Sequence, residues 1–306
     1  MNHKTSTTHR VFDRETPIAL TIDDGDTVDF ECPSIFDWGP NASVDDLMSM
    51  DFVHPHILTG PVAIRGAEPG DALAIDILDV RVTTPQGVTA FMPGFGLLAD
   101  DFDEAHVHVV RYVDKMAEIK EGVRVPLEPF LGIMGVAPAE FGEHSTIPPR
   151  PIGGNLDNRH FRPGTRLILP VEVSGALFSC GDGHAAQGDG EVCGTAVETS
   201  VAATLRFHVL SGQAPSSPRA VVSEPLERTP DRGHLVTTGI GDDLHEGARQ
   251  AVRQMIGLLV AERGLTRQEA YVLCSVAADL KISEIVNEPN WIVSAYLPLT
   301  VFTEGS

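Results

Sequence analysis

Residues 175–198 read GALFSCGDGHAAQGDGEVCGTAVE, and the rest of the chain is arranged around this acidic, glycine-rich segment. Residues 175–180 are apolar and bulky, which is typical of a β-strand that leads into a site. The Gly-Asp-Gly at residues 181–183 favours a turn, because glycine reaches positive φ without steric cost. The apolar residues 192–197 predict a returning strand. We therefore expect two strands joined by an acidic loop.

The polar side chains of this loop have the chemistry of a metal site. Asp182 and His184 lie at i and i+2, and in an extended chain that spacing puts both on one face. A carboxylate oxygen and an imidazole nitrogen can then bind one cation. Asp189 and Glu191 repeat the spacing beyond a second glycine-rich turn. A solvated hairpin loop would also be acidic, but the density of ligand types favours a metal-binding or catalytic loop.

Together with GGNLD at residues 153–157, this segment resembles the signature region of the acetamidase/formamidase family, whose members hydrolyse short aliphatic amides. Four further stretches match the family, and they are TGPVAIRGAEPGDAL (59–73), MPGFGLL (92–98), PFLGIMGVAP (129–138) and AADLKISEIV (277–286). The resemblance thus extends over most of the chain. It implies an amidase whose partner is a small amide of the formamide or acetamide kind.

Composition limits the other classes of function. The 306 residues are 42% hydrophobic and 21% charged, as in a globular protein, and 29 glycines with 22 prolines indicate a turn-rich, β-rich fold. The net charge of −21 argues against nucleic acid or an anionic membrane surface as a partner. We expect neither a signal peptide nor a membrane span, because residues 1–10 are polar and no run of about 18 apolar residues occurs. Four scattered cysteines without a CxxC pair indicate free thiols, so we expect a cytoplasmic protein.

Hydrophobic patterning predicts a mainly β, sandwich-like or barrel-like fold with a C-terminal pair of helices. Strands are expected at residues 72–82, 166–173, 201–209 and 291–302, with a bulge in the first where the alternation slips between Leu78 and Asp79. Residues 242–263 predict an amphipathic helix, and a capping box at 266–269 predicts a second one that ends near Leu280. We expect a β-rich half (1–150) and a second half (151–306) that form one interlocked unit, and a homodimer or higher homo-oligomer.

The predicted metal ligands are Asp157, Asp182 and His184. Asp157 is expected at the start of one strand and Asp182 at the end of the next, so pairing of these strands would bring both to one end of a hairpin. Mixed carboxylate and imidazole ligands favour zinc, and carboxylate-rich sets also suit calcium. A divalent metal lowers the pKa of its water and polarises the carbonyl of an amide. Glu191 is then either a further ligand or the general base.

Other candidate residues lie outside the metal set. His54 precedes the family-like TGP motif and is a second catalytic candidate, whereas we interpret the nearby His56 as solvated. Asn155, Gly183 and Phe95 are candidates for substrate binding, because glycine-opened loops let a backbone or an aromatic ring line a pocket.

Two alternatives remain open at this point. Cys193 lies two residues after Glu191, so a cysteine-dependent amidase with a Glu-assisted thiolate is conceivable. The apolar surroundings of Cys193 argue instead for plain packing. The other alternative is a non-catalytic, metal-containing β-rich binding protein.

Overall fold

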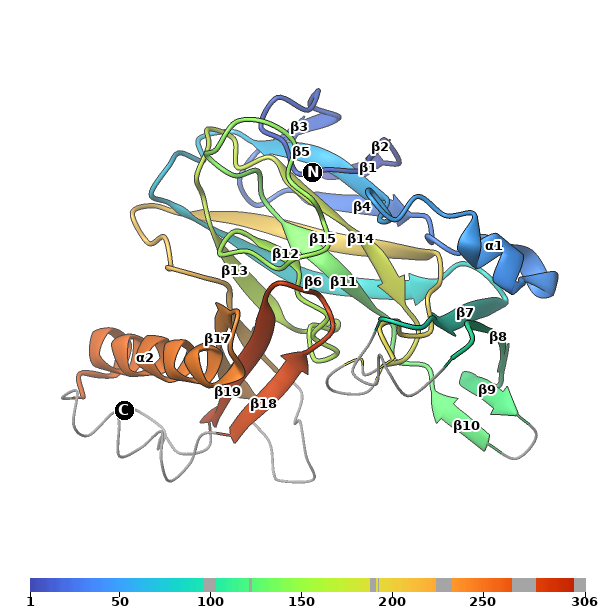
Figure 1. Ribbon diagram of the computed structural model, residues 1–306. Coiled ribbons are helices and arrows are strands. Elements are labelled where there is room, and N and C mark those ends of the chain that lie inside the picture. The colour runs from blue at the N-terminus through green and yellow to red at the C-terminus, as the bar shows by residue number, and fades with distance from the viewer. Residues whose placement is uncertain are drawn as a thin grey trace.

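The computed structural model describes residues 1–95, 103–120, 123–187, 191, 193–223, 233–265 and 279–299. Within these ranges the chain forms three β-sheets, and few of its residues are helical (Figure 1). The mainly β fold class expected from the sequence is confirmed.

The largest sheet has nine strands. In spatial order they are β1 (Asn2–Thr5), β4 (Thr27–Cys32), β15 (Val201–Leu210), β6 (Ala72–Val82), β13 (Arg166–Pro170), β16 (Arg219–Val222), β17 (His234–Gly241), β19 (Trp291–Pro298) and β18 (Asp279–Glu284). The bulge predicted in β6 is present, since β15 pairs Thr204 with Asp79 and Leu205 with Ile77, which leaves Leu78 unpaired. In this sheet β15, from residues 151–306, lies between β4 and β6, which come from residues 1–150. The division into two halves stays a prediction.

The second large sheet carries the glycine-rich segment. Its strands are β12 (Gly153–Asn155), β11 (Phe130–Gly135), β14 (Phe178–His184), β5 (Leu58–Ile64) and β2 (Thr8–His9), with β3 (Leu20–Ile22) paired to β5. A smaller sheet extends from the molecule on the side away from α2 (Leu244–Arg263) in Figure 1. It contains β10 (Val123–Pro126), β9 (Met116–Lys120), β8 (His106–Val113) and β7 (Gln86–Phe91).

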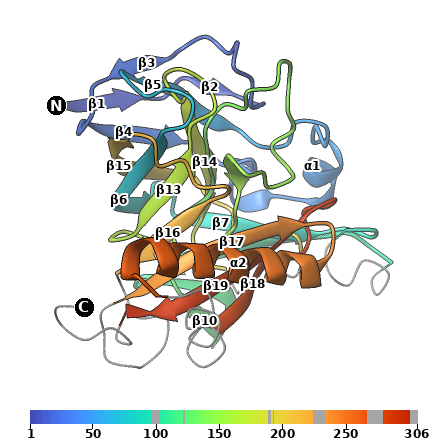
Figure 2. The same cartoon turned by 90° about the vertical axis from the view of Figure 1, so that its left-hand side faces the viewer.

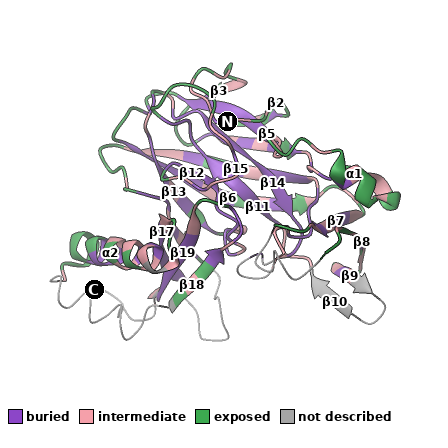
Figure 3. Cartoon of the chain, viewed as in Figure 1, coloured by how far each residue is buried: buried purple, intermediate pink, exposed green. Residues whose placement is uncertain are grey.

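The main hydrophobic core lies between the nine-stranded sheet and the sheet of β14. Phe30 on β4 and Phe207 on β15 meet Phe178 on β14, with ring centroids 5.8 Å and 5.1 Å from that of Phe178. The buried strands of both sheets run through the centre of the molecule in Figure 3. Inward-facing residues of two sheets thus bury each other, as in a β-sandwich.

The long helix α2 begins two residues after its predicted start at residue 242 and ends at the predicted residue, Arg263. Asp243 accepts a hydrogen bond from the backbone N–H of Glu246, and Gly264 closes the helix in a left-handed conformation. Met255 and Leu259 pack on β17 and β19, which α2 crosses in Figure 2. None of the described helices is long and apolar enough to span a bilayer. The other helical elements in the described part of the chain are α1 (Val44–Met48), which has a capping box, and the 3₁₀ turn η1 (Gly39–Asn41).

The turn predicted at residues 181–183 is wrong, because β14 continues to His184. A Cβ at Gly181 would collide with the carbonyl oxygen of Ile57, and one at Gly183 with the carbonyl oxygen of Thr199. Glycine is therefore needed for close packing of neighbouring backbones rather than for a turn.

Three other expectations also need correction. Residues 193–197 form a turn and coil rather than a strand. The predicted hairpin of Asp157 and Asp182 does not form, because β13 and β14 belong to different sheets. The predicted second helix falls mostly on residues 266–278, which lie outside the described residues, and Leu280 belongs to β18.

Candidate active site

The candidate active site is a cluster of buried carboxylates around one imidazole. Asp182 and His184 come from β14, and Asp157 follows β12 by two residues. The Nε2 atom of His184 lies 3.3 Å from Oδ2 of Asp182, 3.3 Å from Oε2 of Glu198 and 3.9 Å from Oε1 of Glu191. All five residues are at least 94% buried, since Glu191 is the most exposed at 6%. The structure thus brings together the four residues that the sequence nominates for metal chemistry and adds Glu198.

The central strand β11 explains how Asp157 and Asp182 meet. β11 lies between β12 and β14, so the two aspartates approach each other across Gly132. A Cβ on Gly132 would lie 2.7 Å from Oδ1 of Asp157, 2.8 Å from Oδ2 of Asp182 and 2.9 Å from Cε1 of His184. The three side chains therefore pack over a position that only glycine can occupy.

Gly132→Ala should disrupt the cluster without disturbing the rest of the fold. The added methyl group must displace the carboxylates, and a ligand displaced by about 1 Å can cost roughly 100-fold in rate. We expect turnover and bound metal to fall at least about tenfold, as measured by amide hydrolysis and elemental analysis. Gly257→Ala on α2 is the control, because a Cβ there meets nothing within 4 Å. Full activity of Gly132→Ala would show that the cluster is not the reaction centre.

The backbone at the site is unusual. Asp157, Asp182 and Glu191 have φ values of 42°, 57° and 47°, in the left-handed region that most L-residues avoid. Such conformations persist only where the surrounding structure enforces them, and they concentrate at functional sites. Here they aim three carboxylates at one point.

Negative charge exceeds positive charge in the cluster. Burial, reinforced by neighbouring carboxylates, raises the pKa of Asp157, Glu191 and Glu198 above the usual range. Burial also opposes the charged form of His184, but Glu198 and Asp182 outweigh it and raise the pKa of the imidazole well above 6.5. Burial likewise opposes ionisation of Asp182, yet His184 and His56 hold the pKa of Asp182 below its usual range. Four buried carboxylates with so few cationic partners require protons or a further cation.

The atoms present fit a divalent cation. Among the described residues, neither Oδ1 of Asp157 nor Nε2 of His184 has a hydrogen-bond partner, although both atoms are buried. Two trios of ligand atoms each lie within 4.8 Å of one another, namely Asp157, His184 and Glu191, and Asp182, His184 and Glu198. Ligands of one ion with bonds of about 2.0–2.2 Å lie roughly 3–3.5 Å apart, which matches the 3.3 Å separations from His184.

Polar neighbours orient these ligand groups. Nδ1 of His184 lies 2.8 Å from Oε1 of Gln187, so an N–H at Nδ1 leaves Nε2 directed to the carboxylates. Gln187 also donates to the carbonyl oxygen of Asp157 at 2.7 Å, and Asn287 donates to Oδ2 of Asp157 at 2.7 Å. Glu284 in turn accepts hydrogen bonds from the backbone N–H groups of Val286 and Asn287. Burial raises the pKa of Glu284 to about 7.

His56, rather than His54, is the histidine beside the cluster. Nε2 of His56 lies 4.0 Å from Oδ2 of Asp182, and its Nδ1 lies 2.8 Å from Oγ1 of Thr146. Burial lowers the pKa of His56, although the charge of Asp182 opposes this effect. The contacts described for His54 are those of its backbone with Arg10 and Asp51. The interpretation of His56 as solvated is therefore wrong.

The three residues nominated for substrate binding lie in different surroundings. Asn155 is buried on β12 and donates to the carbonyl oxygen of Ile147 at 3.2 Å. Gly183 lies within β14 and accepts from the backbone N–H of Thr199. Phe95 lines a cavity of about 290 Å³ that also contacts His56 and Asn287. Of the three, Phe95 is placed where a substrate can reach it.

Four residues at or beside the cluster were not predicted from the sequence, and they are Glu198, Gln187, Glu284 and Asn287. Glu198 is the last residue of the glycine-rich segment, and Glu284 lies in the stretch AADLKISEIV. Both therefore lie in family-like motifs, from which they could have been predicted. Asn287 comes just after that stretch, in a sequence with no distinctive pattern.

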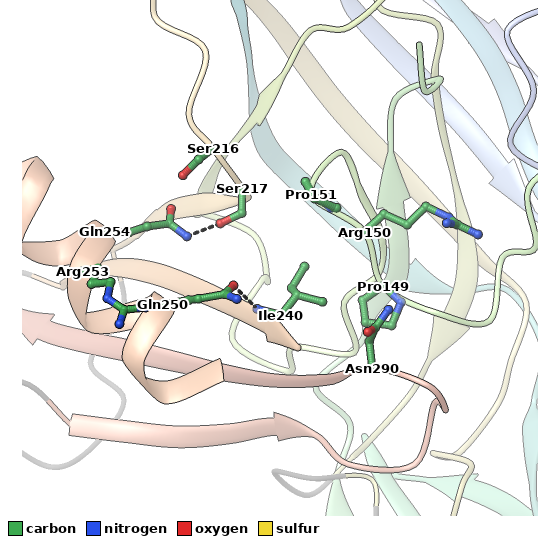
Figure 4. A pocket seen from close by; sticks show the side chains of 10 residues that line it. All are labelled: Pro149, Arg150, Pro151, Ser216, Ser217, Ile240, Gln250, Arg253, Gln254 and Asn290. Carbon is green, nitrogen blue, oxygen red and sulfur yellow. Dashed lines mark hydrogen bonds between the residues drawn. The ribbon is translucent and has the colours of Figure 1, made fainter. Parts of the chain in front are cut away.

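A second cavity, of about 520 Å³, lies beside α2 (Figure 4). None of its lining residues belongs to the carboxylate cluster. Several of its polar side chains are already engaged, since Gln254 donates to Ser217 and Gln250 accepts from the backbone N–H of Ile240. The cavity at His56 adjoins the cluster instead, because its lining residues His56 and Asn287 contact Asp182 and Asp157.

Comparison with known proteins places the chain among amide hydrolases. The sequence profile of the Acetamidase/Formamidase family matches residues 1–143 and 142–304. A putative formamidase of Schizosaccharomyces pombe is 30% identical, over 96% of this chain and 89% of the relative. A formamidase of Methylophilus methylotrophus is 27% identical with the same coverage. The crystal structure of an acetamidase from Bacillus halodurans superposes with a TM-score of 0.89 at 33% identity, covering 99% of this chain and 98% of the other. The chain therefore belongs to the acetamidase/formamidase family.

Proposed function

We propose that this amidase hydrolyses short aliphatic amides of the formamide or acetamide kind to ammonia and a carboxylate, with the help of a divalent metal. Family membership supports amide hydrolysis. The observation that carries the metal is the buried cluster around His184, whose carboxylates have too few cationic partners to remain ionised unaided.

The ligands we propose are Asp157, Asp182 and His184, with Glu198 added from the geometry. A bound divalent ion would supply Lewis acidity toward the amide carbonyl and lower the pKa of a coordinated water. Mixed carboxylate and imidazole donors favour zinc, with calcium as the alternative.

Side chains of this protein carry out the proton transfers of amide hydrolysis. Glu191 is the proposed general base, which takes a proton from the attacking water and returns it to the departing nitrogen. Its Oε1 lies 3.9 Å from Nε2 of His184, whereas the nearest carboxylate oxygens of Asp182 and Glu198 each lie 3.3 Å from that nitrogen. Its raised pKa, due first to burial and then to the charge of Asp157, suits a group that must both accept and release a proton.

Ammonia release from formamide and acetamide, measured together with the metal content of the same sample, tests the proposal. We expect ammonia from at least one amide, about one divalent ion per chain, and loss of activity on chelation. Full turnover by metal-free protein would rule out the metal. A homodimer or higher oligomer and a cytoplasmic location stay predictions.

Cys193→Ala should keep most of the activity, because water rather than a thiolate is the nucleophile. The Sγ of Cys193 lies 3.4 Å from the carbonyl oxygen of Thr195 and 3.9 Å from that of Ala90, contacts typical of packing against β7. We expect kcat within about threefold of the parent in the ammonia assay. Abolished turnover, with unchanged circular dichroism and metal content, would favour the cysteine-dependent mechanism instead.

The non-catalytic binding protein is the weaker alternative. A purely structural metal site is normally closed by its ligands. Here the cluster adjoins a cavity through His56 and Asn287, which gives small molecules a place beside it.

A further inference from the structure

The cavity beside the cluster is mostly apolar. Its walls include the side chains of Phe36, Leu47, Met50, Phe91 and Phe95. Thr195 also lines it, but its hydroxyl is bound to the backbone N–H and carbonyl of Ala90, at 2.9 Å each. The walls therefore offer a substrate chiefly hydrophobic contact.

Two polar side chains connect the cavity to the cluster. His56 lies 4.0 Å from Asp182, and Asn287 donates its amide N–H to Asp157 at 2.7 Å. The carbonyl oxygen Oδ1 is the acceptor of the Asn287 side chain, and it can accept an N–H from a bound amide. A substrate with its amide group at this end would extend its acyl group between the aromatic side chains.

The cavity is too large for formamide or acetamide alone. Its volume of about 290 Å³ is roughly ten times the share of liquid volume of one water molecule, ~30 Å³. It is close to the lower end of ligand pockets, about 300–1,000 Å³. Formamide has no carbon side chain and acetamide only a methyl group, so neither would fill this space.

We propose that the preferred substrate is a primary amide whose acyl group carries a ring-sized apolar substituent, bound in this cavity. The inference rests on the proposed function, because it takes the amide bond to be hydrolysed at the adjacent cluster. The preference for larger acyl groups comes from hydrophobic burial, because each methylene group removed from water raises the affinity by a factor of about four. Aromatic walls add edge-to-face or stacked contacts with a ring.

A panel of acetamide, isobutyramide and benzamide tests the inference on the metal-loaded protein. We expect kcat/KM for benzamide to exceed that for acetamide at least about tenfold, with isobutyramide between them. If acetamide is hydrolysed as well as benzamide or better, the inference is wrong and the proposed function stands.

A variant that fills the cavity gives a second measurement. Ala90 lines the cavity and is buried, so Ala90→Leu should narrow it. We expect kcat/KM to fall at least about tenfold for benzamide and to change less than about threefold for acetamide. Ala139→Leu is the matched control, because Ala139 is exposed and lies outside the cavity. Equal losses on both substrates would overturn the inference.

Calorimetric binding of benzamide and acetamide separates this inference from the proposed function. Binding does not require turnover, so it can be measured even if no amide releases ammonia. Benzamide that binds at least about tenfold more tightly than acetamide supports the apolar acyl pocket in either case. Failure of all amides to react, combined with such binding, would reject the proposed function alone. Equal or weaker binding of benzamide would reject the inference.

Discussion

Asp182→Asn is expected to lose its metal. An amide oxygen is a poorer ligand than a carboxylate, and the pKa of Asp182 lies below its usual range, so the parent side chain is ionised at neutral pH. Asparagine tolerates the left-handed backbone conformation as well as aspartate does, so φ at this position can stay near 57°. We expect the affinity for metal to fall at least about tenfold and turnover to fall with it. Elemental analysis of the purified variant and the ammonia assay measure both effects.

Asp114→Asn is the matched control for this prediction. Asp114 has a φ of 52°, is exposed and lies in the turn between β8 and β9. Its replacement makes the same chemical change in the same backbone conformation without touching the cluster. If Asp182→Asn kept its full metal content, Asp182 would not be a ligand.

Glu191→Gln is expected to keep its metal and to lose turnover by roughly 10² or more, the usual scale for removal of a general base. Glutamine keeps the size of the side chain but cannot accept the proton. Glu198→Gln is the informative comparison, because Oε2 of Glu198 lies nearer to Nε2 of His184 than Oε1 of Glu191 does. We expect that variant to lose metal as well as activity.

The opposite pattern would reassign the roles. If Glu191→Gln lost its metal, Glu191 would be a ligand and the base would have to be another group. His56, which faces both Asp182 and the cavity, would then be the first residue to replace, followed by His54.

Local patterns in the sequence predicted the regular elements well. The alternation in residues 72–82 gave both the strand β6 and its bulge, and helical periodicity with a C-terminal glycine gave α2. Glycine was the source of the main error. The same residue type permits a turn or a close approach of two strands, and only the neighbours in the sheet show that Gly181 and Gly183 serve the second purpose.

The candidate site was predictable where its residues are close in sequence. Asp182, His184 and Glu191 share one unusual segment, and the family-like GGNLD motif adds Asp157. Glu284 and Asn287 reach the same point from the C-terminal part of the chain, and His56 reaches it from the N-terminal part. Their contributions depend on sheet order, which alternation of side chains does not encode.

The left-handed conformations of Asp157, Asp182 and Glu191 bear on how this chain can change under selection. Each such conformation lowers the stability of the folded chain by about 1–3 kcal/mol for a residue with a Cβ. Replacement by glycine would remove this strain and would also remove a buried carboxylate. A library screened for solubility or heat resistance alone should therefore accumulate glycine at these three positions and drift toward inactive proteins. By the same reasoning, a homologous chain that carries glycine there has kept the architecture and given up the reaction, whereas retained acids mark a lineage still selected for catalysis.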